Sequence, residues 1–453
     1  MSGTAQHRIL IQPLKSALIG GMAQKLQILV RVQAPDAPPF EKKARKPYHL
    51  ALVIDRSGSM SGDPLIEAVR CARHMVDRLE PTDIAALAVF DDRVRTLVPA
   101  TPAGDRKTLH NALATIHPGG STDLHGGWQA GANELLPGAS SAALARVILL
   151  SDGNANVGVL RDTAGIAACC AKAAEAGVTT STYGLGRDFN EDLMVAMAER
   201  GGGNHYYGDT AADLFEPFAE EFDLISSLFG RQVRLSLATA PGVTLRRLND
   251  YPVDASGPMP VIRLPDIAYG AEAWALVELE VPAALARTEA GLLLQAAVTA
   301  ATPEGTPIAY SDATLALEAV SAGAWETLLA NPLVIARRAE IEAGQLLARA
   351  RQAAEFGDWG SIERLLAEAR QRFADQPWLI QVLENMLEIA RAQDVARFRK
   401  EAIYAAKKMG GRLSAKEELS MDISDESAAP SFLRRKSAQG KAQFGQKPGD
   451  PQK

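Results

Sequence analysis

The stretch LALVIDRSGSM at residues 50–60 decides the fold, because it joins a buried strand to a polar loop. Its first five residues are apolar and have the length and composition of a strand inside a sheet. The acid Asp55 follows at once, and two hydroxyls come next at Ser57 and Ser59. The glycine between these serines permits a tight loop. This pattern predicts a ligand site where the strand ends, at the carboxyl edge of a parallel sheet.

Short β-type runs alternate with helix-type stretches from His49 to about Phe229. The runs after the first are IAALAVF, RVILL and VTTSTY. The first helix is expected from Pro64 to Leu79, with apolar residues recurring along one face. These residues are Leu65, Val69, Ala72, Val76 and Leu79. The alternation predicts an α/β domain in which helices cover a parallel sheet.

Two further loops carry oxygen-bearing side chains toward the same edge. The segment VILLSDGNANVG places Asp152 directly after another strand, and GGSTDLHGG supplies Thr122 in a glycine-rich loop. Because the carboxyl ends of parallel strands meet at one edge, these residues are expected beside the first loop. The five side chains that these loops bring together all carry hard oxygen atoms, and they are Asp55, Ser57, Ser59, Thr122 and Asp152.

An Asp-x-Ser-x-Ser loop, a later Thr in a glycine-rich loop and a Ser-Asp-Gly turn together resemble a known site. It is the metal-ion-dependent adhesion site (MIDAS) of von Willebrand factor type A (VWA) domains. The resemblance covers about residues 48–229. It implies a Rossmann-like, doubly wound, mostly parallel sheet, with the five residues as direct or water-mediated contacts of Mg²⁺. Mn²⁺ and Ca²⁺ are alternative ions. In such a site an Asp or Glu from a partner protein completes the coordination.

Several nearby residues are expected to have other roles. Asp91 and Asp92 are predicted to shape a turn at a strand end, and Asp123 is placed at the periphery of the site. His117 and His125 flank Thr122, but a single loop histidine is more often solvated or structural, so we leave both out.

Signatures of common enzymes are weak in this sequence. The run GGGNH at residues 201–205 lacks the Lys and Ser or Thr of a phosphate-binding loop and is predicted to be a turn. Ser57 and Ser59 do not stand in the Gly-x-Ser-x-Gly context of a serine hydrolase. We therefore expect a binding protein and not an enzyme.

The pattern of apolar and polar residues is different on both sides of the α/β domain. Two N-terminal strands are expected at Ile9–Gln12 and Leu26–Val32, and alternating runs typical of a β-sandwich begin after Gly230. Since two strands cannot bury a core alone, the N-terminal strands are expected to join the later sheet. The α/β domain is then inserted in the β-sandwich.

The expected domains follow from these shifts in composition. Residues 1–46 hold the N-terminal strands and a linker, 47–229 the VWA domain, 230–321 the β-sandwich, 322–411 a helical region and 412–453 a disordered tail. In the helical region two helices are separated by FGDWGS, and a single unit of this kind is weak support for a tetratricopeptide array.

Composition limits the class of protein. The chain has 453 residues and a formal net charge of −6, which argues against binding nucleic acid through phosphate neutralisation. The three cysteines, Cys71, Cys169 and Cys170, lie in apolar helical stretches with no sign of disulfides. Because we find neither a signal peptide nor an apolar run of about 20 residues, a soluble cytoplasmic protein is expected. Ser437 follows three basic residues and resembles a substrate of basic-directed kinases, and the alternative is a solvated basic tail.

The function indicated is that of a cytoplasmic adaptor or scaffold that binds an acidic residue of a partner through Mg²⁺. The arrangement resembles bacterial soluble VWA proteins with flanking β-domains. By the same resemblance, an AAA+ ATPase of the MoxR or chelatase type is a candidate partner. One alternative is a Mg²⁺-dependent hydrolase or phosphoryl-transfer enzyme, which lacks a visible base. Another is a structural subunit with an incidental metal that forms homo-oligomers through its helical region.

Overall fold

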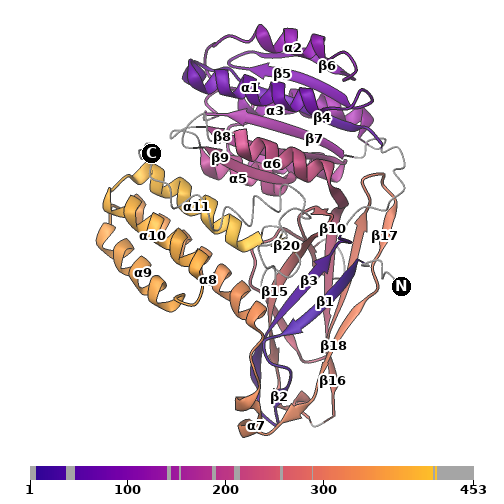
Figure 1. Ribbon diagram of the computed structural model, residues 1–453, viewed down its shortest axis with the longest axis vertical. Helices are drawn as coiled ribbons and strands as arrows, with labels where there is room; N and C mark the ends of the chain where they lie inside the picture. Colours follow the sequence, from indigo (N-terminus) through magenta and orange to yellow (C-terminus); the bar gives the residue numbers. More distant parts are fainter. Residues whose placement is uncertain are drawn as a thin grey trace, which may run out of the picture. The chain divides into compact units, whose positions relative to one another are not determined.

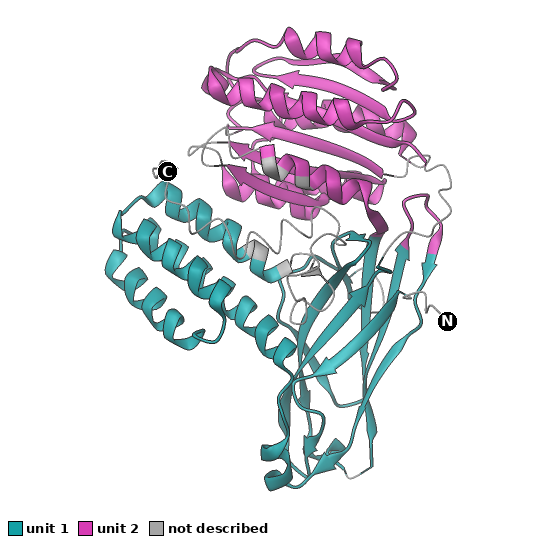
Figure 2. Ribbon diagram, in the orientation of Figure 1, with its two compact units in different colours: residues 1–38, 232–300, 308–453 teal, residues 39–231, 301–307 magenta. Residues whose placement is uncertain are grey.

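The computed structural model describes residues 7–36, 46–139, 144–152, 155–185, 190–208, 215–255, 259–287, 289–411 and 414–415 (Figure 1). The chain divides into two compact units (Figure 2). The α/β unit comprises residues 39–231 and 301–307, and the sandwich unit comprises residues 1–38, 232–300 and 308–453.

The α/β unit is built on a sheet with the strand order β6-β5-β4-β7-β8-β9. The strands are β4 (Tyr48–Asp55), β5 (Ile84–Phe90), β6 (Val94–Pro102), β7 (Leu144–Ser151), β8 (Val178–Leu185) and β9 (Gly202–Gly208). All neighbours are parallel except β6, which runs antiparallel to β5 at one edge. Every residue of β4 is buried, as expected for a central strand covered on both faces. The predicted α/β fold is confirmed.

Helices cover both faces of this sheet. They are α1 (Asp63–Arg78), α2 (Arg106–Ala114), α3 (Leu124–Leu135), α4 (Thr163–Glu175), α5 (Glu191–Arg200) and α6 (Phe215–Ser226). Leu50, Leu52 and Ile54 of β4 share a core with apolar residues of α1, α2 and α6. Side chains alternate across a strand, so Val53 points to the opposite face. There it meets α3 so closely that a Cβ at Gly131 would lie 2.4 Å from its Cγ2 atom.

A buried ion pair joins the sheet to α6. Arg146 of β7 donates from Nη1 to Oε1 of Glu221 over 2.6 Å, and both side chains are at most 3% exposed. Glu221 also accepts hydrogen bonds from Ser181, Asn204 and Tyr206. Burial alone would raise the pKa of Glu221, but Arg146 and these donors hold it below the ordinary value. The carboxylate is therefore ionised in the core.

The glycine run at residues 201–205 corrects one prediction, because it is not a turn. Gly202 begins β9, which pairs in parallel with β8. A Cβ at Gly203 would lie 2.2 Å from the carbonyl oxygen of Thr180, so glycine is what allows the two backbones to approach. The pairing register also shifts between Thr180 and Thr182. Sheet pairing, which is a tertiary interaction, has overridden the local preference of glycine for turns.

The described part of the sandwich unit contains two large sheets and one two-stranded sheet. The first has the order β1-β3-β15-β11 with β20 also paired to β15, and the second has the order β12-β13-β10-β16-β17 with β14 and β18 attached. The first sheet consists of β1 (Arg8–Pro13), β3 (Gln24–Gln33), β11 (Thr244–Arg247), β15 (Ala271–Val281) and β20 (Ser414–Ala415). The second consists of β10 (Leu228–Thr239), β12 (Val253–Asp254), β13 (Val261–Arg263), β14 (Ile267–Ala268), β16 (Gly291–Ala301), β17 (Pro307–Ala309) and β18 (Ala313–Leu317). A parallel pair of β2 (Leu18–Ile19) and β19 (Ala319–Val320) stands apart.

The N-terminal strands complete the first sheet. β3 pairs antiparallel with β15 along its whole length, from Gln24 opposite Val281 to Gln33 opposite Glu272. The intervening residues, which include the α/β unit, are therefore inserted between two strands of one sheet. The predicted insertion in a β-sandwich is confirmed.

The helical region follows the second sheet within the sandwich unit. It comprises α7 (Ala322–Thr327), α8 (Pro332–Glu355), α9 (Trp359–Arg372), α10 (Pro377–Arg391) and α11 (Val395–Gly411). Asp358 caps α9 by accepting a hydrogen bond from the amide of Ser361 over 3.1 Å. In the described part of the chain, no helix has both the length and the apolar composition needed to span a bilayer. The predicted tail, residues 412–453, lies outside the described residues except for β20.

Helix α8 packs on the first sheet through one apolar cluster. Leu29, Trp274 and Leu276 of the sheet meet Val334 and Ile341 of the helix. The guanidinium of Arg337 lies 4.8 Å from the ring centre of Trp274 and pairs with Glu340 over 2.9 Å. A cation over an aromatic face is attractive, so this contact adds to the apolar burial.

The side chain of Asn249 ties β15 to the end of α11. Its Oδ1 atom accepts a hydrogen bond from the amide of Leu276, and its Nδ2 atom donates to the carbonyl of Gly410, each over 2.6 Å. Asn249 is buried. The substitution Asn249→Ala leaves the buried amide of Leu276 without an acceptor, which costs about 1–3 kcal/mol. We expect the Leu276 amide to exchange its hydrogen about tenfold faster, as measured by hydrogen–deuterium exchange.

The neighbouring variant Asp250→Ala is the control, since this side chain is exposed. It should leave the exchange of the Leu276 amide at the wild-type rate. Equal exchange rates in Asn249→Ala and in the wild type would show that water replaces the asparagine as the acceptor for Leu276.

Candidate functional site

The predicted site residues lie at the carboxyl ends of the two central strands. Asp55 is the last residue of β4, and Asp152 directly follows β7. These strands are parallel neighbours with Ile54 opposite Leu150, so their ends meet. Thr122 stands in the loop that leads into α3. Strand order alone therefore brings both acids to one place.

Hydrogen bonds connect four of the five predicted residues. The Oδ1 atom of Asp55 accepts from the amide of Ser57 over 2.8 Å. The hydroxyls of Ser57 and Ser59 lie 3.2 Å apart, and that of Ser59 donates to Oδ1 of Asp152 over 2.9 Å. We call Asp55, Ser57, Ser59 and Asp152 the hydroxyl–acid network. Its members come from two loops and form one continuous chain of polar contacts.

Thr122 is held next to this network through its backbone. The amide of Gly119 donates to the carbonyl of Arg56 over 2.6 Å, and the amide of Gly58 donates to that of Gly120 over 2.9 Å. On its other side, the carbonyl of Thr122 accepts from the amides of Asn156 and Val157, over 3.0 and 3.2 Å. The loop of Thr122 is therefore tied to the two loops that carry the network. The role of the five residues as metal ligands stays a prediction.

The carboxylate of Asp55 is placed where a negative charge is costly. Asp55 is fully buried, and this burial raises its pKa above the ordinary value even though Ser151 and Ser57 donate hydrogen bonds to it. Among the described residues it has no ion-pair partner. A bound dication would compensate this buried charge, so the environment of Asp55 fits a metal ligand.

The donor set also fits a hard cation. Two carboxylates and three hydroxyls present only oxygen, the element that Mg²⁺ prefers, and water commonly completes its six-fold coordination. Over the described ranges, no group of three or more His, Cys, Asp and Glu side chains is placed to hold a metal. A cation here would therefore depend on hydroxyls and water as well as on the two acids.

Sequence reasoning missed two supporting contacts. The hydroxyl of Ser151, the residue before Asp152, donates to Oδ2 of Asp55 over 2.5 Å and orients this carboxylate. Asp91 shapes a turn, as predicted, by accepting from the amide of Arg93 over 2.7 Å. It also pairs with Arg56 over 2.8 Å, inside the motif loop. The sequence offers one clue to these two contacts. Ser151 and Arg56 each stand next to a predicted metal ligand in the chain.

The residues left out of the site take no part in the hydroxyl–acid network. Asp123 caps α3 by accepting from the amide of Gly126 over 2.9 Å. His125 lies in the first turn of α3, where burial lowers its pKa and favours the neutral ring. His117 and Asp92 are exposed.

Gly119 is a position where a side chain has no room. A Cβ there would lie 1.8 Å from Oδ2 of Asp91, the atom that pairs with Arg56. We expect Gly119→Ala to push apart the loops that carry Arg56 and Thr122, at a stability loss of about 1–3 kcal/mol. The displaced loop should also weaken divalent-metal affinity about tenfold or more. Urea unfolding and titration with Mn²⁺ measure the two effects.

Gly291→Ala provides the control, because nothing lies within 4 Å of a Cβ at that position. It should leave both quantities unchanged. Wild-type metal affinity in Gly119→Ala would mean that the contact between the loops does not position the site.

Comparison with known proteins identifies one stretch of the chain with a described family. Residues 49–220 match the family model described as the von Willebrand factor type A domain. This range begins within β4 and ends within α6. It therefore contains all five predicted site residues.

Two bacterial relatives share sequence with the chain, and both are named as uncharacterized proteins. YfbK of Escherichia coli K12 is 29% identical over 192 residues, which is 42% of this chain and 33% of YfbK. The protein sll0103 of Synechocystis is 26% identical over 266 residues, which is 56% of this chain and 61% of sll0103. The chain thus spans about a third and about three fifths of these relatives.

Two solved structures share the fold over most of the chain. A von Willebrand factor type A protein from Catenulispora acidiphila has a TM-score of 0.65 at 16% identity, covering 86% of this chain and 91% of its own. The ArnB paralog VWA2 from Sulfolobus acidocaldarius has a TM-score of 0.59 at 18% identity, covering 89% and 98%. At such identities the likeness concerns the fold alone, and it extends beyond the α/β unit.

Proposed function

Because residues 49–220 form a von Willebrand factor type A domain, we propose that this protein is a metal-dependent protein-interaction module. It acts as a cytoplasmic adaptor or scaffold and binds an acidic residue of a partner protein through Mg²⁺. The observation that carries this proposal is the hydroxyl–acid network at the carboxyl ends of β4 and β7.

The proposal assigns a role to each residue of the site. Asp55 and Asp152 balance the charge of the dication, while Ser57, Ser59 and Thr122 offer neutral hydroxyls. Neutral donors leave the ion able to attract a further carboxylate. Mn²⁺ or Ca²⁺ would bind to the same oxygens.

Burial indicates the side from which a partner approaches. Asp55, Ser57 and Thr122 are buried, whereas Ser59 is exposed. A partner carboxylate would therefore enter beside Ser59. The proposed role is binding and not catalysis, because both acids of the site serve as ligands and neither is left to act as a base.

The cysteines support a reducing compartment and have no role in the proposal. Cys71, Cys169 and Cys170 are free, which is usual for proteins of the cytoplasm. Burial raises the pKa of Cys71 to about 12, and burial also raises the pKa of Cys170. Thiols of this kind are poor nucleophiles at neutral pH.

A pull-down from a lysate of the source organism tests the proposal. The wild type and Asp55→Ala are each used as bait with Mg²⁺ or with EDTA, and captured proteins are identified by mass spectrometry. Partners bridged by the metal should be lost in both perturbations. Replacing one Asp or Glu on such a partner should abolish its capture as well. An AAA+ ATPase of the MoxR or chelatase type is a partner to look for.

Asp77→Ala is the matched control bait. Asp77 lies near the end of α1 away from the site and forms an exposed pair with His110. This bait should capture the same partners as the wild type. If the same proteins bind without metal and with Asp55→Ala, metal-bridged recognition is wrong for them. A change in sedimentation on adding EDTA, without any partner, would favour the structural-subunit alternative.

A further inference from the structure

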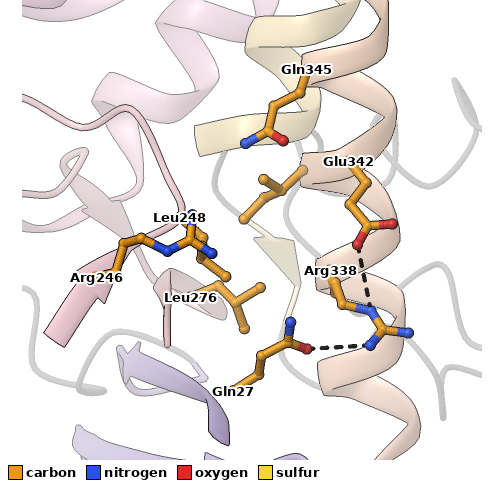
Figure 3. Close-up of a pocket in the computed structure, with 8 residues that line it drawn as sticks. Gln27, Arg246, Leu248, Leu276, Arg338, Glu342 and Gln345 are labelled. Carbon is orange, nitrogen blue, oxygen red and sulfur yellow. Dashed lines mark hydrogen bonds and ion pairs between the residues drawn. The ribbon is translucent and has the colours of Figure 1, made fainter. Parts of the chain in front are cut away.

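A cavity of about 100 Å³ lies in the sandwich unit between the first sheet and α8 (Figure 3). Its apolar lining comes from Leu248, Leu276 and Ile341. Its polar lining includes two arginines, Arg246 of β11 and Arg338 of α8. The cavity therefore combines a small apolar floor with cationic walls.

The nearby acids do not use up the hydrogen-bonding capacity of these arginines. Arg246 donates from Nε and Nη2 to one oxygen of Glu278, over 3.3 and 3.0 Å, and its side chain is 63% exposed. Arg338 donates from Nη1 to Gln27 over 3.4 Å and lies 3.9 Å from Glu342. A guanidinium carries five N–H donors, so donors remain on both arginines for another acceptor.

Glu342 only partly neutralises the cavity. Its Oε2 atom pairs with Arg372 over 2.6 Å, while the distance of 3.9 Å to Arg338 is long for an ion pair. Figure 3 shows Arg338 between Gln27 and Glu342, on the wall formed by α8. Across the cavity stands Arg246, so the walls favour an acidic ligand.

We propose that residues 417–426 of this chain, the acidic segment, bind in this cavity. The sequence of this segment, EELSMDISDE, contains five acids and no basic residue. Leu419, Met421 and Ile423 alternate with polar residues. In an extended segment these three side chains fall on one side. Ile423, the last of the three, meets the apolar floor, and the acids that flank it meet Arg246 and Arg338.

The position of β20 places the segment within reach of the cavity. Ala415 pairs with Ala271 of β15, the strand that also supplies Leu276. Five residues of a strand span about 17 Å. Because β20 is antiparallel to β15, the chain leaves Ala415 in the direction away from Leu276 and has to turn back.

The length of the segment is sufficient for this reversal. Ile423 stands eight residues after Ala415, a length that extends to about 27 Å when stretched. This leaves about 10 Å for a turn, so Ile423 can lie over Leu276. Because the tether is short, the acidic segment has a local concentration in the millimolar range near the cavity, so weak contacts are enough for it to bind. This inference does not depend on the proposed metal site.

Photo-crosslinking of the full chain tests the inference. Gln345 lines the cavity and is exposed, so it is replaced by p-benzoylphenylalanine. After irradiation, mass spectrometry should locate the crosslinks in the acidic segment, with the same yield in Mg²⁺ and in EDTA. The same label at Phe356, which is 86% exposed just beyond the end of α8, is the control. It should not crosslink to the acidic segment.

Charge variants show whether the arginines recruit the segment. Arg246→Gln should lower the crosslinking yield from position 345 about two- to fivefold, the effect of losing one exposed ion pair. Arg246→Glu should lower it further, and combining it with Asp422→Arg should restore part of the yield. Since Arg246 is largely exposed, circular dichroism should show unchanged folding in these variants.

Three results would overturn the inference. The first is a yield unaffected by Arg246→Glu, and the second is an absence of crosslinks to the acidic segment. The third is a loss of crosslinks on adding Mg²⁺, since this would place the acids of the segment at the metal site instead. Mixing isotope-labelled and unlabelled chains adds a further criterion. Crosslinks between the two kinds of chain would assign the cavity to a second copy and contradict binding within one chain.

Discussion

Mg²⁺ is expected to raise the melting temperature of the wild-type α/β unit and to leave that of Asp55→Asn unchanged. A ligand present at about a hundred times its dissociation constant stabilises the folded state by about 2.7 kcal/mol. For a unit of this size the shift is about 5–10 °C. Asparagine keeps the shape of Asp55 and can still accept from the amide of Ser57, while its NH₂ group can donate to the hydroxyl of Ser151, which accepts in place of donating. The substitution removes the negative charge. Differential scanning calorimetry with Mg²⁺ or EDTA measures the effect.

The same experiment contains its own check on folding. Because the buried carboxylate of Asp55 is costly without a cation, Asp55→Asn in EDTA should be at least as stable as the wild type. The variant Asp77→Ala should keep the full response to Mg²⁺. An equal shift in the wild type and in Asp55→Asn would place the stabilising metal elsewhere on the protein.

Glu221→Gln is expected to cost about 3–5 kcal/mol of unfolding free energy, the largest loss that we predict for a single substitution. The variant removes the carboxylate that pairs with the buried guanidinium of Arg146. It also turns one oxygen of the carboxylate into a donor, although the contacts of Glu221 with Ser181, Asn204 and Tyr206 need acceptors. Urea unfolding of the α/β unit at pH 7 measures the loss.

The loss caused by Glu221→Gln should depend on pH in a defined direction. The folded state holds the pKa of Glu221 below its ordinary value, so the stabilisation is fully present above the pKa of the unfolded chain. That pKa is about 4.3. The stabilisation then disappears as the pH falls through the lower pKa of the folded state. The gap between wild type and variant should therefore be constant near neutral pH and shrink below about pH 4.

Glu175→Gln is the matched control, because Glu175 is exposed at the end of α4. Its unfolding free energy should stay within about 0.5 kcal/mol of the wild type. A Glu221→Gln variant as stable as this control would show that the ion pair with Arg146 adds no net stability.

The sequence by itself determined the fold class and the candidate site. A run of apolar residues that ends in Asp55 predicts a buried strand followed by a polar loop, because local order alone sets both features. The alternation of strands and helices predicts that the strand ends share one edge. Those two rules select Asp55, Ser57, Ser59 and Asp152, and the glycine-rich loop adds Thr122. The role of all five as metal ligands comes from the resemblance to the adhesion site.

Only the tertiary structure decided which atoms meet. The contact of Ser151 with Asp55, the ion pair of Arg146 with Glu221 and the pairing of β20 with β15 join residues 75 or more positions apart. Such contacts depend on strand order, register and burial, which no local pattern encodes. Burial also changes the pKa values of the acids. It raises the pKa of Asp55, and it would raise that of Glu221 if Arg146 and the hydrogen-bond donors around Glu221 did not lower it. Composition and spacing carry none of this information, since the same residues in water would have their ordinary pKa values.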